Sequence, residues 1–307
     1  MGIERIKIPG KVMLSGEYAV LEGGKAVLAP INRFLEIWED PDNPSVETTP
    51  IIGFALNESV PELEEFEEKN GKPNVFVDRE EFYGINEAGN KAKLGIGSSA
   101  AEAVGVIALR FQRAGFDWKT KREQVAHYAE VAHRKAQDGK GSGADVFTCA
   151  IGQPIIFSRE KEIISWEVAK IDKSFNIPIS LLWTGIPADT RVFVKKFNYW
   201  KKSHTKSKPL ITGLVEASDS LAESWFRAPQ EVLNNQIDVF VSRMQEIAIE
   251  AQFEWRLQIH DDISGWIFEQ GGRAKPTGAG GGDLVLLVGK CDIADRKELA
   301  LEIELGK

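Results

Sequence analysis

The sequence has 307 residues, of which 43% are hydrophobic, and a chain of this length and composition can build a large core in one or two domains. Its formal net charge is −8 and its basic residues form no extended stripe, which argues against nucleic acid as a partner. No apolar run approaches the roughly 18 residues that cross a bilayer, and the first residues lack the apolar core of a signal peptide. We therefore expect a soluble, cytoplasmic protein with no membrane partner.

The cysteines and histidines indicate no metal centre. The two cysteines, Cys149 and Cys291, form no C-x-x-C pair and lie in apolar surroundings, so a zinc site is not expected. The four histidines follow neither a metal-ligand nor a catalytic-triad pattern. We expect packing or solvent contact for each of them.

The first third of the chain reads mainly as strands. Residues 5–39 alternate β-type apolar runs with Gly and Pro, which predicts two or three strands joined by short turns. Residues 39–75 are rich in Asp, Glu, Pro and Asn and read as variable connections. Residues 73–78, PNVFVD, predict another short strand.

Two helices are predicted next. The first follows the segment GIGSSAA, with a stop at Gly115 and apolar residues at helical spacing, namely Val104, Ile107, Ala108 and Phe111. Ser99 and Glu102 have the spacing of a capping box at its start. Thr120 and Glu123 have the same spacing at the start of a second helix, whose small apolar face ends before DGKGSGAD at residues 138–145.

The second half is predicted to mix strands with long helices. Strand-like segments are VFTCAIGQPIIFS (146–158), ISLLWTG (179–185) and LVLLVG (284–289), and helical segments are 209–226 and 229–258. The basic run 195–208 could attract a polyanionic substrate, although such a run is usually a solvated loop. Residues 292–307 read as a helix, with no further edge strand. We expect a domain boundary near residue 175.

A glycine-rich loop at residues 95–101, GIGSSAA, places two glycines and two hydroxyls at a helix start, where free N–H groups and the helix dipole favour a phosphate. No Gly-Lys pair is followed by Ser or Thr, so a Walker A loop is absent. Two alternatives stay open for this loop. It can be a helix cap alone, or a G-x-G-x-x-A dinucleotide fingerprint with Asp117 about 20 residues further on, although the preceding EAGNKAK is not a buried strand.

A second glycine-rich run, KPTGAGGGD at 275–283, immediately precedes an apolar segment of strand length. Such a run allows left-handed backbone conformations and close approach of a ligand to the main chain. It therefore indicates a loop bent around an anion, and the alternative is a tight hairpin before a core strand.

Three segments occur in the order of the three signature motifs of the GHMP kinase superfamily, and the sequence resembles that family through them: PGKVMLSGEYAVLEGG (9–24), KLGIGSSAA (93–101) and KPTGAGGGD (275–283). Within the superfamily, AHRKAQDGKGSGADV (132–146) and LLWTGIPADT (181–190) are similar to segments of the phosphomevalonate kinases. The resemblance implies an α+β fold. Its amino-terminal domain, residues 1–175, would be ribosomal-protein-like with a left-handed β-α-β crossover, its carboxy-terminal domain, residues 176–307, would be ferredoxin-like, and the active site would lie between them.

The resemblance also implies the roles of individual residues. Lys11 and Asp145 match the catalytic lysine and the aspartate that pairs with it. The nucleotide phosphates would contact Lys93, Gly95, Gly97, Ser98, Ser99 and Ala100, and Mg²⁺ would bind Ser99 and Glu130. The second substrate would contact Glu17, Tyr18, Ser142, Gly143, Gly278, Ala279, Gly280 and Gly281.

The activity implied is the phosphorylation of 5-phosphomevalonate to its diphosphate with ATP and Mg²⁺, in isoprenoid precursor synthesis. The partners would be ATP and this small molecule, and a homodimer is possible. Mevalonate kinase or another small-molecule GHMP kinase is the alternative, and a decarboxylase of the same pathway fits the quoted segments less well. A non-catalytic nucleotide-binding regulator is a further alternative, against which the presence of both Lys11 and Asp145 argues.

Overall fold

The computed structural model describes residues 4–40, 49–188, 190–291 and 300–301, and the chain divides into two compact units. Unit 1 consists of residues 1–11, 30–83 and 96–152, and unit 2 of residues 12–29, 84–95 and 153–307. Because these segments alternate along the chain, strands β1 (Ile6–Ser15) and β2 (Ala26–Glu39) each contribute residues to both units. The single domain boundary near residue 175 stays a prediction.

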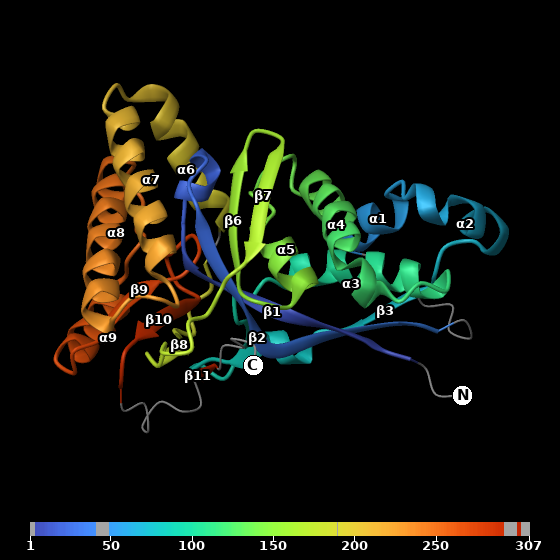
Figure 1. Cartoon of the computed structure of the whole chain (residues 1–307), viewed down its shortest axis with the longest axis horizontal. Helices are drawn as coiled ribbons and strands as arrows, with labels where there is room; N and C mark the ends of the chain where they lie inside the picture. Colours follow the sequence, from blue (N-terminus) through green and yellow to red (C-terminus); the bar gives the residue numbers. More distant parts are fainter. Residues whose placement is uncertain (1–3, 41–48, 189, 292–299, 302–307) are drawn as a thin grey trace. The chain divides into compact units, whose positions relative to one another are not determined.

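Unit 1 combines parts of β1 and β2 with a short strand and a group of helices (Figure 1). Strand β3 pairs antiparallel with the end of β2, with Glu36 opposite Asp78 and Glu39 opposite Val75. The remaining elements of this unit are β3 (Val75–Asp78), α1 (Pro50–Asn57), α2 (Glu64–Asn70), α3 (Ser98–Arg113), α4 (Arg122–Ala136) and α5 (Ala144–Ile151), with short 3-10 helices at Pro61–Leu63, Glu80–Phe82 and Trp118–Lys121.

Helix α3 is the centre of unit 1, because it contacts α1, α4 and α5. Every one of its residues from Ala100 to Phe111 is buried. Gly105 allows β2 to approach closely, since a Cβ atom there would lie 3.0 Å from Cγ2 of Ile37. The predicted helix at this position is confirmed, and its burial on all sides fixes the position of its first turn.

Three predictions for unit 1 are wrong. Residues 39–75 contain α1 and α2 as well as connections, and VFTCAIG forms helix α5 and its end instead of a strand. Neither predicted capping box forms: α3 begins after Gly97 and α4 after Lys121, both without a side-chain cap, and the Thr120 hydroxyl donates to the Asp117 carbonyl at 2.8 Å.

Unit 2 contains two antiparallel arrangements of strands. The start of β2 pairs with β6 (Ile155–Glu160), which pairs with β7 (Ile163–Val168). A second sheet has the order β11-β8-β10-β9, formed by β8 (Ile179–Trp183), β9 (Arg273–Pro276), β10 (Leu284–Val288) and β11 (Ala300–Leu301). This order, in which the fourth strand lies beside the first and the third beside the second, is that of a ferredoxin-like sheet.

Among the described residues of unit 2 are four α-helices: α6 (Thr190–Ser203), α7 (Ser207–Ser224), α8 (Gln230–Glu250) and α9 (Gln258–Phe268). Helices α7 and α8 run side by side, and α9 packs on β9 (Figure 1). The unit also holds a 3-10 helix at Ala19–Glu22 and the small pair β4 (Tyr83–Ile85) and β5 (Lys91–Lys93). None of the helices within the described ranges combines the length and apolar character that a membrane crossing requires.

Two predictions for unit 2 are wrong. The basic run 195–208 is not a loop, because α6 occupies it as far as Ser203, with Phe197 and Trp200 buried beneath its lysines. An edge strand that was not expected near the carboxyl end exists as β11, where Ala300 pairs with Leu182. The rest of the predicted helix, residues 292–299 and 302–307, lies outside the described residues.

Arg110 of α3 stabilises the position of α2 within unit 1. Its side chain is fully buried and donates to both carboxylate oxygens of Glu67, at 2.7 and 2.9 Å, and to the Ala55 carbonyl at 2.8 Å. Removal of one member of a buried ion pair leaves the other charge without compensation, which costs about 3–5 kcal/mol. We expect Arg110→Met to lower the free energy of unfolding by this amount in urea titrations.

The exposed pair Lys69–Glu65 on α2 supplies the control, because both of its side chains are at least 70% exposed. Such a pair contributes at most about 0.5 kcal/mol, so Lys69→Met should leave the unfolding midpoint nearly unchanged. Equal effects of the two substitutions would contradict the role assigned to Arg110.

Candidate functional site

The loop before α3 leaves the start of this helix open to a ligand. Gly97 is the N-cap residue, with φ of 84°, and no side chain caps the helix. The first N–H groups of a helix have no partner within it, and together with the helix dipole they attract an anion. Gly97, Ser98 and Ser99 are half-buried, so this end of α3 is accessible.

Lys11 lies directly against this loop. Its main-chain N–H donates to the Ile96 carbonyl at 2.9 Å, and a Cβ atom on Gly97 would lie 2.8 Å from Cε of Lys11. Gly97 is therefore required both by its left-handed backbone and by the close approach of the lysine. The result is a cation beside the open start of α3, and the binding of a phosphate there stays a prediction.

Helix α5 brings Asp145 into the same part of unit 1. The helix begins after Gly143, whose φ is 87°, and Asp145 lies in its first turn, where Oδ1 accepts a hydrogen bond from the Val146 N–H at 3.0 Å. Burial raises the pKa of the Cys149 thiol, the charge of Asp145 raises it further, and the charge of Lys11 lowers it. Both charges therefore act on one buried thiol, although no ion pair between Lys11 and Asp145 is present among the described residues.

Helix α4 contributes Glu130 and His133, which are three residues apart and so lie on one face. His133 Nε2 is 3.1 Å from the Ser99 hydroxyl and 2.9 Å from Nε2 of Gln137. Glu130 is 4% exposed, forms an ion pair with Arg134 at 3.4 Å, and its Cγ would lie 2.7 Å from a Cβ atom on Gly143. His133 was predicted only to pack or face solvent. Its spacing from Glu130 is the signal that could have identified it.

These residues fit a magnesium ion better than a transition metal. Within the described ranges, no group of three or more His, Cys, Asp or Glu side chains could hold a metal. Mg²⁺ usually keeps several waters and takes one or two carboxylates together with substrate phosphates, and a hydroxyl is also a suitable hard ligand. Ser99, which contacts His133, and Glu130, which pairs with Arg134, offer a hydroxyl and a carboxylate of this kind, and their role as magnesium ligands stays a prediction.

The glycine-rich loop between β9 and β10 is the main feature of unit 2. Left-handed φ values occur at Gly278, Gly280, Gly281, Gly282 and Asp283. A Cβ atom would lie 2.2 Å from Trp255 Cδ1 at Gly280, and 2.3 Å from Phe193 Cε2 at Gly281. The backbone itself therefore lies against two aromatic rings, and this explains the concentration of glycine.

Asp283 joins three predicted segments within unit 2. Its N–H donates to the Ile186 carbonyl at 2.7 Å and its carbonyl accepts from the Thr184 N–H at 2.8 Å. Its carboxylate accepts from the Ala188 N–H at 3.2 Å, and a Cβ atom on Gly95 would lie 2.5 Å from its Cγ. The beginning of the GIGSSAA loop, the TGIPA segment and the end of the 275–283 loop thus meet at this residue.

Glu17 and Tyr18 were predicted to contact substrate, and the structure gives both side chains partners inside unit 2. Glu17 forms a buried ion pair with Lys275, and the Tyr18 hydroxyl donates to the Ala279 carbonyl at 2.9 Å. The Tyr18 ring packs on Phe197 and Phe253, with centroids 5.0 and 5.3 Å away. Both residues therefore support the 275–283 loop, and Lys275 is a functional candidate for which the sequence predicted no role.

The remaining predicted residues lie in less defined surroundings. Lys93 is exposed at the end of β5, directly before the buried Leu94 and two residues before Gly95. The Ser142 hydroxyl accepts from the Ala144 N–H at 3.3 Å, so it bends the chain toward α5. Because units 1 and 2 are described separately, the predicted meeting of the three motifs in one active site stays a prediction.

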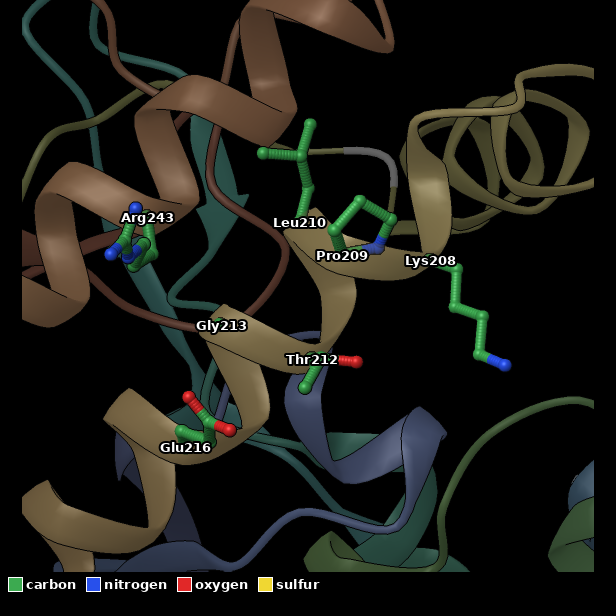
Figure 2. Close-up of a pocket in the computed structure, with 7 residues that line it drawn as sticks. All are labelled: Lys208, Pro209, Leu210, Thr212, Gly213, Glu216 and Arg243. Carbon is green, nitrogen blue, oxygen red and sulfur yellow. The ribbon is translucent and has the colours of Figure 1, made fainter.

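An open hollow elsewhere in unit 2 has none of these features. Figure 2 shows Arg243 of α8 facing α7, whose residues Lys208, Pro209, Leu210, Thr212, Gly213 and Glu216 form the rest of the lining. Arg243 forms an ion pair with Glu246 at 3.4 Å. No residue of the three motifs lines this hollow, and we do not assign the site to it.

Comparisons with known proteins agree with this geometry. Residues 83–153 match the family model "GHMP kinases N terminal domain". Similar solved structures include the Lin0012 protein from Listeria innocua, which is 22% identical with a TM-score of 0.80 and covers 99% of this chain and 98% of its own. No curated protein matches the sequence.

Two further similar structures are named kinases. Streptococcus pneumoniae phosphomevalonate kinase, in complex with phosphomevalonate and AMPPNP, is 16% identical with a TM-score of 0.72 and covers 96% of this chain and 94% of its own. L. major mevalonate kinase, in complex with R-mevalonate, is 17% identical with a TM-score of 0.66 and covers 99% and 97%. The chain has the GHMP kinase fold, and the predicted resemblance to this superfamily and the predicted fold class are confirmed.

The first prediction for the candidate site concerns Gly97. An alanine at this left-handed position costs roughly 1–2 kcal/mol of backbone strain, and its Cβ would also displace Lys11. Gly115 has a φ of 87° with nothing within 4 Å of an added Cβ, so Gly115→Ala imposes the strain without the contact. We expect both variants to lose similar stability, and only Gly97→Ala to raise the Kd for ATP by about tenfold or more, measured by calorimetric titration. If Gly97→Ala and Gly115→Ala bind ATP with equal affinity, Lys11 and the loop at Gly97 are not part of the nucleotide site.

The second prediction concerns His260, which is fully buried near the 275–283 loop. Desolvation by burial and the charge of Arg256 lower its pKa from 6.5 to about 4. The unfolded chain therefore takes up a proton that the folded protein does not, and stability falls as the pH drops from 6.5 to about 4, by up to about 3 kcal/mol. We expect His260→Asn to lose less stability than wild type between pH 7 and pH 4.5 in urea titrations. The exposed His204 is the control, because His204→Asn should keep the wild-type pH dependence.

Proposed function

We propose that the protein is a kinase that transfers the γ-phosphoryl group of ATP to 5-phosphomevalonate, with Mg²⁺. The observation that carries the proposal is the position of Lys11 beside the open start of α3. Asp145 lies in the same part of unit 1, because its charge and that of Lys11 both affect the pKa of the buried Cys149 thiol. A cation beside free helix N–H groups is what phosphoryl transfer needs, since this reaction depends on positioning and charge neutralisation. The AQDGKGSGAD and WTGIPADT segments favour a phosphorylated acceptor.

The proposed reaction assigns a separate role to each of the three motifs. The N–H groups at Ser98 to Ala100 would bind phosphate oxygens of ATP, and Ser99 and Glu130 would hold a magnesium ion, which would neutralise phosphate charge. Lys11 lowers the repulsion between the donor and acceptor anions. The 275–283 loop offers backbone N–H groups to the acceptor. Mevalonate is the competing acceptor, and a cytoplasmic location and a homodimer belong to the same proposal.

The acceptor determines the role of Asp145. A phosphomonoester has a second pKa of about 6, so it is mostly a dianion at neutral pH and needs no general base. Asp145 then serves to orient Lys11. A hydroxyl acceptor such as mevalonate would instead need its proton removed, and an aspartate base contributes roughly 10² to 10⁴-fold to such a step.

The third prediction tests the reaction and these roles together. In a coupled assay of ADP release with mevalonate, 5-phosphomevalonate, galactose and homoserine, we expect turnover with 5-phosphomevalonate and loss of activity below about pH 6, where this acceptor protonates. Lys11→Met should lower kcat by about 10² to 10³-fold, and Asp145→Asn by less.

Two exposed residues serve as matched controls. Lys7, on the same strand as Lys11, pairs with Glu36 at 2.8 Å, and Asp138 precedes the loop that leads to Asp145. Lys7→Met and Asp138→Asn should keep wild-type kcat. If Asp145→Asn lowers kcat more than Lys11→Met does, and also abolishes the loss of activity below about pH 6, then Asp145 is a general base and the acceptor is a hydroxyl. If the wild-type protein binds ATP but turns over none of the four acceptors, a non-catalytic nucleotide-binding regulator becomes the better interpretation.

A further inference from the structure

Lys275 and Glu17 form an ion pair that is buried on all sides within unit 2. Lys275 and Glu17 are each 1% exposed, although they are 258 positions apart in the sequence. The Lys275 ammonium donates to Glu17 Oε1 and to the Pro276 carbonyl, the latter at 3.0 Å, and lies 5.7 Å from the centroid of the Phe240 ring. Lysine and glutamate are almost never fully buried unless they are paired.

The burial of this pair is costly, and stability alone does not account for it. Desolvation raises the pKa of Glu17 and lowers that of Lys275, which means that the surroundings oppose both charges. Buried ion pairs can often be replaced by apolar residues of similar volume with no loss of stability. A role that depends on the geometry of the pair is therefore a better explanation than a role in folding.

Both members of the pair contact the 275–283 loop. Lys275 begins this segment and also bonds its next residue, Pro276. On the other side, the Gly278 N–H faces the Glu17 carboxylate and helps to lower its pKa, and the adjacent Tyr18 hydroxyl holds the Ala279 carbonyl at 2.9 Å. Glu17 and Tyr18 thus hold the loop at two consecutive residues, Gly278 and Ala279.

The loop needs such external contacts because its own backbone is permissive. Glycines with left-handed φ can adopt many conformations, so the observed one must be selected by its surroundings. In the part of the chain that the structure describes, the N–H groups of Ala279 and Gly282 have no hydrogen-bond partner. The N–H groups of Gly280 and Gly281 between them donate to the Thr277 and Trp255 carbonyls, so two separate donors of the bend remain for an anion.

We propose that Lys275 and Glu17 are positioning residues, which hold the 275–283 loop in the one conformation that offers the Ala279 and Gly282 N–H groups to an anionic phosphate of the acceptor. The identity of the acceptor rests on the proposed function. The pair itself touches no substrate, since both side chains are buried. The pair determines how well the 275–283 loop is ordered, and this order can be measured by amide hydrogen exchange without any substrate.

The experiment compares Lys275→Met with the double variant Glu17→Gln/Lys275→Met. The single variant leaves a buried carboxylate unpaired and can fail to fold, whereas the double variant carries no buried charge and should keep near wild-type stability. Amide hydrogen exchange of a peptide covering residues 275–283 should be about tenfold faster or more in the double variant. The KM for 5-phosphomevalonate should rise by a similar factor, with kcat and the KM for ATP changed by less than about threefold.

An exposed ion pair in the same unit supplies the control. Lys25 and Glu223 are 3.0 Å apart, with side chains 42% and 70% exposed, so Lys25→Met/Glu223→Gln should change neither the exchange nor the KM. Tyr18→Phe, which removes the hydroxyl from the Ala279 carbonyl and no charge, should give a smaller increase in exchange.

The proposal is overturned if the folded double variant keeps wild-type exchange in this loop, or if exchange accelerates while the KM for 5-phosphomevalonate does not change. The two proposals fail separately. If wild-type protein turns over none of the acceptors, the proposed function is wrong, and the exchange comparison still decides whether the pair orders the loop.

Discussion

The candidate nucleotide site depends on one backbone constraint, which is that α3 and α5 begin after glycines in the left-handed conformation. Gly97 and Gly143 are the N-cap residues, with φ of 84° and 87°, and neither helix has a side-chain cap. A Ser or Asp cap would have bonded the first N–H groups and removed them from a ligand. Glycine at this position leaves the first donors of α3 to a ligand, whereas in α5 the Ala144 and Val146 N–H groups donate to the side chains of Ser142 and Asp145. Glycine also lets Lys11 approach the chain at Gly97 and Glu130 approach it at Gly143.

The two lysines of the motifs occupy opposite electrostatic environments. Lys11 is half-buried and no ion pair of its side chain is among the described interactions, so its charge is available to an incoming anion. Lys275 is buried and its ammonium donates to Glu17 and to the Pro276 carbonyl. Because an ammonium with three donors can serve either purpose, burial and partners decide which lysine acts on a ligand and which acts on the protein.

The sequence predicted the helix of the phosphate loop and the core strand β10 because strong periodicity and glycine spacing are local signals. The sequence-based predictions failed where contacts with residues distant in the sequence determine the local structure. The Ser99–Glu102 capping box has the right spacing, but Ser99 contacts His133 and Glu102 pairs with Arg79 at 2.6 Å. VFTCAIG has the composition of a strand, yet it forms a buried helix after Gly143. The Lys275–Glu17 pair joins two motifs that give no local sign of each other.

In the proposed function, the 275–283 loop would contribute direction to anion binding and no uncompensated positive charge. His260, which lies near the loop, has a pKa of about 4 and is therefore neutral at pH 7, and the charge of Lys275 is compensated by Glu17. What remains is a set of N–H dipoles, which orient an anion but neutralise little of its charge. In the proposed reaction, the neutralisation of two phosphates must then come from Lys11 and the magnesium ion. This division explains why a loop rich in glycine, and not in lysine or arginine, can serve the acceptor.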